Sequence, residues 1–249
     1  MQLKDAVVVV TGGTGGLGQR ICHAFAREGA RVAVVYQQAD DKAKAVAEEL
    51  KVAGGGGTPY RCDVTKLDEV EALVERVVAD HGRLDVLVNN AGFNQFVPFA
   101  DVEQLTPDLF EKILQYNTSA PYYISRAAAR PMRKQGQGRI VNIASIAGLQ
   151  PSGSSIAYAV SKAALIHLTR CLAKGLAPEV TVNCVAPGLM EGTRMTARLP
   201  DEMVQSGRSG AWLHKAADKD DVAAQVVTFA KSDTITGQTV AIDAGVFAH

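Results

Sequence analysis

Two side chains in the second half of the chain could together move a proton. Tyr158 and Lys162 are four residues apart, so on a helix they lie on the same face, one turn from each other. A free tyrosine has a pKa of ~10 and is a poor base near neutral pH, but an adjacent ammonium group favours the phenolate. Tyr158 could then take a proton from an alcohol, or donate one to a carbonyl that is being reduced. The same spacing, taken alone, also fits an ordinary pair on a helix surface.

Two further polar residues precede this pair. Ser145 follows a strand-like run, and its hydroxyl could hold a substrate oxygen on which charge develops during a reaction. A lone serine there could equally be a turn or cap residue, and Asn117 could simply bond backbone groups. The order and spacing of these residues behind a phosphate-binding loop make them catalytic candidates.

That loop is the segment Thr11-Gly12-Gly13-Thr14-Gly15-Gly16-Leu17-Gly18. It stands between the first strand-like run and an amphipathic helix. Glycines allow a tight turn and a close approach of backbone N–H groups to a diphosphate, and the helix presents its positive N-terminus to that charge. We expect the ligand to meet Gly12, Thr14, Gly16, Leu17 and Gly18. A glycine turn used only for packing is the alternative.

The elements that position these residues alternate along the chain. Continuous apolar runs, typical of buried parallel strands, are separated by stretches with helical periodicity, and Thr106-Pro107 has the residue types of a helix start. This alternation predicts a single-domain, doubly wound (Rossmann-type) α/β fold over residues 1–249, a parallel sheet with helices on both faces. The expected strands are Val7–Val10, Arg31–Val35, Pro59–Cys62 (the weakest), Asp85–Asn89, Arg139–Ile143, Thr181–Ala186 and Thr239–Ile242.

Two stretches are expected to be loops. Ala53–Thr58 contains four consecutive glycines and is predicted only to connect a helix to a strand. Leu189–Gly210 lacks clean periodicity, and a loop that long inside a compact domain is more often a lid or binding loop than filler. We therefore expect residues 189–210 to cover a substrate.

The composition argues against several classes of protein. The chain has 26 basic and 26 acidic residues, whereas a nucleic-acid-binding domain is usually basic. The four cysteines form no CxxC and are expected to be reduced thiols, and the five histidines lack metal-ligand spacing. No apolar run reaches the ~18 residues of a membrane span, and no signal-peptide cleavage site is apparent. We expect a cytoplasmic protein without a metal, nucleic-acid or membrane partner.

The glycine spacing resembles that of the short-chain dehydrogenase/reductase family, and further motifs follow in the family's order. Asn89-Asn90-Ala91-Gly92 is similar to the family's Asn-Asn-Ala-Gly, and Tyr158-Ala159-Val160-Ser161-Lys162 to its Tyr-x-x-x-Lys. Asn117, Ser145 and Pro187-Gly188 occupy the corresponding family positions. The resemblance covers essentially the whole chain, and by length and motif spelling it is nearest to members resembling 3-oxoacyl-carrier-protein reductases.

The resemblance implies roles for particular residues. Tyr158 and Ser145 would act on the substrate, Lys162 would also bind the nicotinamide ribose, and Asn117 would hold a water in a proton relay. Asn89 would stabilise the sheet. The resemblance also implies an NAD(P)-dependent oxidoreductase that transfers a hydride. It implies, separately, that the protein is a homotetramer. Residues implied in cofactor binding, beyond those of the loop, are Tyr36, Gln37, Asp63, Val64, Asn90, Ala91, Gly92, Tyr158, Lys162, Pro187, Gly188 and Thr193.

Two of these implied positions carry an alternative. Thr193 stands one place later than the threonine that the family pattern puts after Pro-Gly, which leaves its role open. Asp63 ends the third expected strand and would reach the adenine ring, but it could also cap the following helix.

The end of the second expected strand bears on the choice between NAD and NADP. An acidic residue there accepts the ribose 2′-hydroxyl in NAD-preferring proteins, but this chain has Tyr36, Gln37 and Gln38. Asp40 and Asp41 are expected to start the next helix. Because no carboxylate would repel a 2′-phosphate, the sequence favours NADP, while NAD stays open.

Three functions remain open. The first is reduction of a neutral or partly apolar ketone or 3-oxoacyl-type substrate, the second oxidation of a sugar, polyol or other secondary alcohol, and the third dinucleotide sensing without turnover. Arg194, Arg198 and Arg208 could contact an acidic group, but are expected to form a solvated lid face. Residues expected to face the substrate are Phe93, Gln95, Phe96, Ile146, Leu149, Gln150, Met190, Met195 and Trp212.

Overall fold

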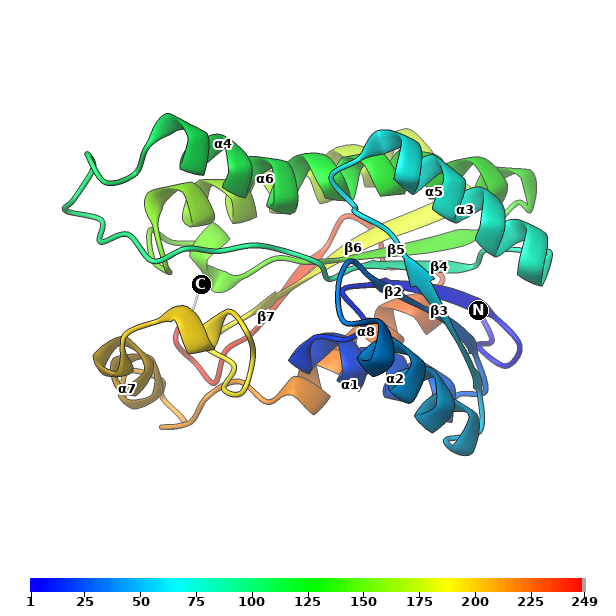
Figure 1. Cartoon of the computed structure of the whole chain (residues 1–249), viewed down its shortest axis with the longest axis horizontal. Coiled ribbons are helices and arrows are strands. Elements are labelled where there is room, and N and C mark those ends of the chain that lie inside the picture. The colour runs from blue at the N-terminus through cyan, green and yellow to red at the C-terminus, as the bar shows by residue number, and fades with distance from the viewer. Residues whose placement is uncertain (248–249) are drawn as a thin grey trace.

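The computed structural model describes residues 1–247 and contains one seven-stranded sheet (Figure 1). Ala248 and His249, the last two residues of the expected domain, lie outside the described residues. Every strand pairs in parallel, in the order β3-β2-β1-β4-β5-β6-β7. This confirms the doubly wound α/β fold. The strands are β1 Val7–Thr11, β2 Arg31–Tyr36, β3 Gly56–Arg61, β4 Val86–Asn89, β5 Gly138–Ile143, β6 Val180–Pro187 and β7 Thr239–Ile242.

Helices cover both faces of the sheet (Figure 1). One layer contains α1 (Gly16–Arg27), α2 (Asp40–Val52) and α8 (Lys219–Lys231), and the other contains α3 (Leu67–His81), α4 (Pro107–Leu114), α5 (Ala120–Lys134) and α6 (Ile156–Leu176). The expected start of α4 is confirmed, because the side chain of Thr106 accepts a hydrogen bond from the Leu109 N–H and Pro107 is the first helical residue.

The alternation of side chains along a strand explains why the strands are apolar throughout. In β1, Val8 and Val10 are buried with Phe25 of α1 in one core, whereas Val7 and Val9 are buried with Val77 of α3 in the other. Each of these four valines therefore packs with one of the two helix layers.

One expected loop is wrong. Residues 56–58 of Ala53–Thr58 belong to β3, which begins at Gly56 and ends at Arg61. A Cβ at Gly57 would lie 2.5 Å from the carbonyl oxygen of Ala47 in α2, and one at Gly55 would lie 2.3 Å from that of Ala30. The glycines permit this close backbone approach. A run of glycines is also typical of turns, so the composition alone does not distinguish a closely packed strand from a loop.

The expected loop Leu189–Gly210 is also more ordered than expected. It contains a short 3-10 helix, η3 (Thr196–Arg198), and α7 (Asp201–Ser209). Neither helix has a buried residue, so the sequence here lacks the apolar periodicity that would predict a helix.

The strand order reverses between β1 and β4, and ligands of such sheets bind at the carboxyl ends of the strands beside this point. The glycine loop follows β1, Asn90–Gly92 follow β4, Ser145 follows β5 and Pro187 ends β6. The fold thus brings the motif residues to one edge. By length and composition α6 could span a membrane, but in this fold it carries Tyr158 and Lys162 and packs beside β6.

Candidate active site

The glycine loop forms a cradle for an anion in front of α1. Gly12 has a φ of +63°, and a Cβ at Gly18 would lie 2.2 Å from the Gly12 carbonyl oxygen, so only glycine permits this turn. The N-cap residue Gly15 makes no side-chain cap bond, and the first turn of α1 contains no acidic residue. Unpaired N–H groups at a helix N-terminus suit a diphosphate.

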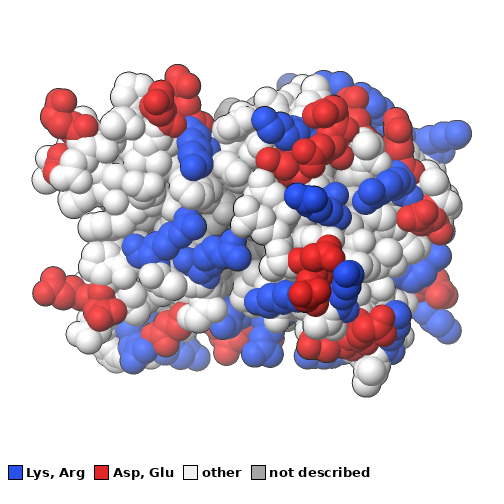
Figure 2. All heavy atoms as spheres, viewed as in Figure 1, with Lys and Arg blue, Asp and Glu red and all other residues white. Residues whose placement is uncertain are grey.

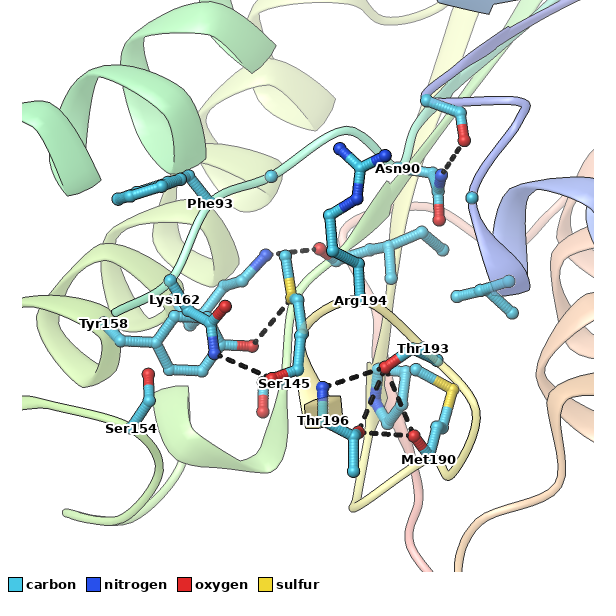
Figure 3. A pocket seen from close by; sticks show the side chains of 18 of the residues that line it. Asn90, Phe93, Ser145, Ser154, Tyr158, Lys162, Met190, Thr193, Arg194 and Thr196 are labelled. Atoms are coloured by element: carbon cyan, nitrogen blue, oxygen red, sulfur yellow. Dashed lines mark hydrogen bonds between the residues drawn. The ribbon is translucent and has the colours of Figure 1, made fainter. Parts of the chain in front are cut away.

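Asn90 and Thr11 hold the loop against the end of β4. The Asn90 amide donates to the carbonyl oxygens of Thr11, at 2.8 Å, and Gly12, at 3.2 Å. The Thr11 hydroxyl accepts from the backbone N–H groups of Asn90, at 2.9 Å, and Ala91, at 3.0 Å. Figure 3 shows Asn90 beside this loop. Asn89 behaves as expected and holds the sheet, because its buried amide donates to Ser125 and Asn142.

Ser145 and Tyr158 are placed by two helix starts. Ser145 is the N-cap of η2, a 3-10 helix over Ile146–Gly148, and its hydroxyl accepts from the Ala147 N–H at 3.2 Å. Ser155 caps α6 by accepting from the Tyr158 N–H at 3.2 Å. A Cβ at Gly148 would lie 2.5 Å from the backbone of Lys162, so η2 packs directly on α6.

Lys162 is buried below Tyr158. Lys162 is 4% exposed, and its Nζ donates to the Ile143 carbonyl oxygen at 2.9 Å. Nζ also lies 5.7 Å from the centroid of the Tyr158 ring. Burial lowers the pKa of Lys162 to about 8, although nearby Cys184 acts in the opposite direction.

In the polypeptide alone the pKa of Tyr158 is shifted upward, and its expected lowering by Lys162 and a bound nicotinamide stays a prediction. Burial raises the pKa of the Tyr158 phenol above its ordinary value of 10.0, against an opposing hydrogen bond with Ser145. Desolvation disfavours the phenolate, and here it outweighs the hydrogen bond with Ser145. Tyr158 is therefore protonated at neutral pH.

Asn117 lies in a π-helical turn, η1 (Gln115–Ser119), and is fully buried. Its amide donates to the Phe93 carbonyl oxygen at 2.8 Å and to the Ser161 hydroxyl at 3.0 Å, and its Oδ1 accepts from the Phe93 N–H at 2.9 Å. Asn117 thus bonds backbone groups, the alternative that its sequence position left open. Its role in holding a water stays a prediction.

The segment 189–210 lies across the front of the site. Met195 Sδ is 4.0 Å from the Tyr158 hydroxyl, which donates to it, and a Cβ at Gly16 would lie 2.7 Å from the Gly192 carbonyl oxygen. Thr193, whose role was open, bonds within the segment: its hydroxyl accepts from the Thr196 N–H at 3.1 Å and contacts the Met190 carbonyl oxygen (Figure 3).

These parts enclose a cavity of about 660 Å³, within the range of ligand pockets. Most of the expected site residues line it, including the glycine-loop contacts, Ser145, Tyr158 and Lys162. Also lining it are Tyr36, Gln37, Val64, Asn90, Ala91, Gly92, Pro187, Gly188 and Thr193. Within residues 1–247 no group of three or more His, Cys, Asp or Glu side chains could hold a metal.

Two expected site residues lie outside the lining, Asn117 and Asp63. The Asp63 carboxylate accepts from the N–H and hydroxyl of Thr65, at 3.0 and 2.7 Å. It does not cap α3, whose N-cap is Lys66.

Of the residues expected to face the substrate, Gln95, Phe96, Leu149 and Trp212 do not line the cavity. Trp212 packs on Gly245 and is 73% exposed. Lining residues that sequence reasoning missed include Lys112, Tyr116 and Ser154. Lys112 of α4 stands four residues before Tyr116 of η1, a helical spacing that was an available signal, whereas Ser154 precedes the start of α6 and had none.

Comparison with known proteins agrees with this geometry. The short chain dehydrogenase family model matches residues 6–204. The chain is 33% identical over 249 residues to the 3-oxoacyl-(acyl-carrier-protein) reductase of Thermotoga maritima, covering 98% of this chain and 99% of that protein. It is 30% identical over 251 residues to the 7alpha-hydroxysteroid dehydrogenase of Bacteroides fragilis, covering 100% and 96%.

The fold is similar to that of the NADPH-dependent 3-quinuclidinone reductase from Rhodotorula rubra, with a TM-score of 0.91, 30% identity and coverage of 98% and 92% of the two chains. The chain therefore belongs to the short-chain dehydrogenase family, and it is an oxidoreductase of this NAD(P)-dependent class.

The substitution Gly16→Val tests the glycine loop. A side chain at this position would obstruct the diphosphate and displace Gly192, so we expect at least a tenfold loss of NADPH affinity, measured by NADPH fluorescence titration, with the far-UV circular dichroism unchanged. Gly175→Val is the matched control, because a Cβ there meets no atom within 4 Å. Wild-type affinity in folded Gly16→Val would show that the loop is not the phosphate site.

Proposed function

We propose that the chain reduces a ketone or 3-oxoacyl-type substrate with NADP(H). The observation that carries this proposal is the convergence of Ser145, Tyr158 and Lys162 on the wall of one pocket that the glycine loop also lines. The names of the relatives support the substrate class, since one is a 3-oxoacyl reductase and another a hydroxysteroid dehydrogenase.

The residues present fit a dinucleotide. Gly12 and Gly18 form a cradle that a Cβ would fill, and the start of α1 offers unpaired N–H groups. Asn90, Ala91, Pro187 and the buried Lys162 would hold the rest of the cofactor. When bound, the nicotinamide would supply the hydride for reduction.

The chain's own residues would handle the proton. The Ser145 hydroxyl would hold the carbonyl oxygen, and the Tyr158 phenol would donate its proton to that oxygen. The raised pKa of Tyr158 keeps this proton in place at neutral pH. The Lys162 ammonium would then stabilise the phenolate left behind. Alcohol oxidation, the alternative, would run the same proton transfer in reverse, with the Tyr158 phenolate accepting the proton.

The preference for NADP(H) rests on the residues at the end of β2. Tyr36, Gln37 and Gln38 line the pocket, and Asp40 starts α2 as expected. The Asp40 carboxylate accepts from the Tyr36 hydroxyl and pairs with Lys44 at 2.7 Å, and these two contacts lower the pKa of Asp40. No carboxylate among the described lining residues would repel a 2′-phosphate.

The segment 189–210 would act as the substrate lid, and the protein would work in the cytoplasm, since its four cysteines are free thiols in the described chain. It would assemble as a homotetramer. Apolar side chains exposed on α5 and α6, Tyr122 and Val160, support a partner there, being 43% and 44% exposed.

Tyr158→Phe tests the proton donor. We expect kcat for ketone reduction to fall by about 10²–10⁴-fold, because the ring still packs while the proton is lost, and NADPH affinity to stay within about threefold. Single-turnover NADPH absorbance and fluorescence titration measure the two effects. Tyr123→Phe, on α5 outside the pocket lining, is the control, and an unchanged rate in Tyr158→Phe would refute the assignment.

The pH profile tests Lys162. Because its pKa is lowered to about 8, the ammonium loses its proton as the pH rises through that value, and kcat for reduction should be level between pH 6 and 7 and fall with a midpoint near pH 8. Lys162→Arg keeps its charge throughout this range, so any residual activity should show no fall near pH 8. The same midpoint in both proteins would contradict the role of Lys162.

Tyr36→Asp tests the cofactor preference. The new carboxylate would repel the 2′-phosphate, so kcat/KM with NADPH should fall at least tenfold relative to NADH. Tyr36→Asn removes the same hydroxyl without adding charge and serves as control. A strong NADH preference in the unchanged protein would overturn the proposal.

Light scattering tests the assembly. A homotetramer should have four times the 26.3 kDa mass of the chain, and Val160→Asp should reduce that mass by placing a charge in an apolar interface. A monomer at micromolar concentration in the unchanged protein would refute the homotetramer.

A further inference from the structure

The pocket has an unbalanced set of charges. Lys112, Lys162, Arg194 and Arg198 line it, and none of its lining residues in the described chain is Asp or Glu. Figure 2 shows Lys and Arg side chains beside the hollow on the face in view. An anion entering this pocket would meet no like charge among these residues.

Two of the cations converge on one aromatic ring. Lys112 Nζ of α4 lies 4.8 Å from the centroid of Phe93, and the Arg198 guanidinium carbon of η3 lies 5.1 Å from it. Cations are attracted to aromatic faces at such distances. The ring is itself fixed, since Asn117 bonds both backbone groups of Phe93 and the ring packs against Tyr116. The Arg198 guanidinium also donates to the Asn94 carbonyl oxygen at 2.8 Å.

Neither of these cations is neutralised. Arg208 of α7 forms an ion pair with Glu191, whereas in the described part of the chain no carboxylate pairs with Lys112, Arg194 or Arg198. Lys162 is buried, with its Nζ donating to the Ile143 carbonyl oxygen and lying beside Tyr158. Arg194 extends toward Asn90, on the glycine-loop side, whereas Phe93 lies on the side of Tyr158 (Figure 3). Lys112 and Arg198 therefore stand on the substrate side.

A buried hydroxyl on the same side also lacks a partner. Ser154 is 2% exposed and lines the pocket, and its Oγ makes no hydrogen bond. Figure 3 shows it beside Tyr158. Leaving a buried polar group unpaired costs free energy, so a polar substrate atom would be favoured here.

From these contacts we propose that the substrate is a ketone that carries an anionic group, a carboxylate or a phosphate, bound by Lys112 and Arg198 around Phe93. This inference rests on the proposed reductase function. It replaces the sequence-based expectation of a neutral ketone, which followed from the apolar residues near the motifs before the two cations were placed. Met195 and Tyr116 would contact the carbon chain between the carbonyl and the anion.

The test compares acids with their esters. The substrates are 3-oxo and 4-oxo carboxylates of increasing length with their methyl esters, and dihydroxyacetone phosphate with dihydroxyacetone, each assayed with NADPH. We expect kcat/KM to favour the anion at least tenfold, mainly through KM. Lys112→Gln and Arg198→Gln should each lower kcat/KM for the anionic substrate about 5- to 10-fold, where a tenfold change corresponds to about 1.4 kcal/mol. For the neutral counterpart of that substrate, kcat/KM should change by less than about twofold.

Arg208→Gln is the matched control, since Arg208 is already paired with Glu191. This variant should change kcat/KM for neither the anionic nor the neutral substrate. Added salt should weaken the preference. A preference limited to carboxylates, or to phosphates, supports the inference and identifies the group. Esters reduced as well as acids, or a preference that both variants retain, would overturn this inference alone. Failure to reduce any carbonyl would overturn the proposed function, and this inference with it.

Discussion

Lys162 places an ammonium group in the interior, where its Nζ donates to the Ile143 carbonyl oxygen at 2.9 Å. Burying a charge is costly unless it is paired or hydrogen-bonded, and this cost appears as the lowered pKa of Lys162. The bond ties α6 to the end of β5. Because Ser145 follows β5 and Tyr158 lies one turn before Lys162, the same bond sets the positions of both side chains.

Burial affects Tyr158 in the opposite sense. The interior that makes Lys162 easier to deprotonate makes the Tyr158 phenol harder to ionise. Both shifts fit the proposed donation of a proton by the phenol and stabilisation of the phenolate by the ammonium. The segment 189–210 contributes to this environment, because Met195 covers the Tyr158 hydroxyl. In the proposed reaction a substrate carbonyl would take the place of that sulfur, and an anionic tail held by Lys112 and Arg198 would favour the exchange.

Much of the fold could be predicted from the sequence because buried parallel strands are continuous apolar runs, and six of the expected strands agree with the structure to within one residue at each end. β3 was misplaced at its start because close helix packing and turns both use glycine. The motif residues could be predicted to lie together, because the carboxyl ends of parallel strands meet at one edge of the sheet. Asn117, Asp63 and Trp212 could not be placed, because their hydrogen bonds and packing depend on tertiary contacts. Lys112 and Ser154 were missed because neither stands in a motif.

The proposed reduction requires a protonated Tyr158 at neutral pH, because the phenol is the acid. The most direct test is an ultraviolet titration of tyrosinate absorbance, taken as the difference between the unchanged protein and Tyr158→Phe. We expect the residue missing from the variant to ionise above the ordinary tyrosine pKa of 10.0. A difference signal already present at pH 7 would contradict it, because Tyr158 would then be a phenolate with no proton to give.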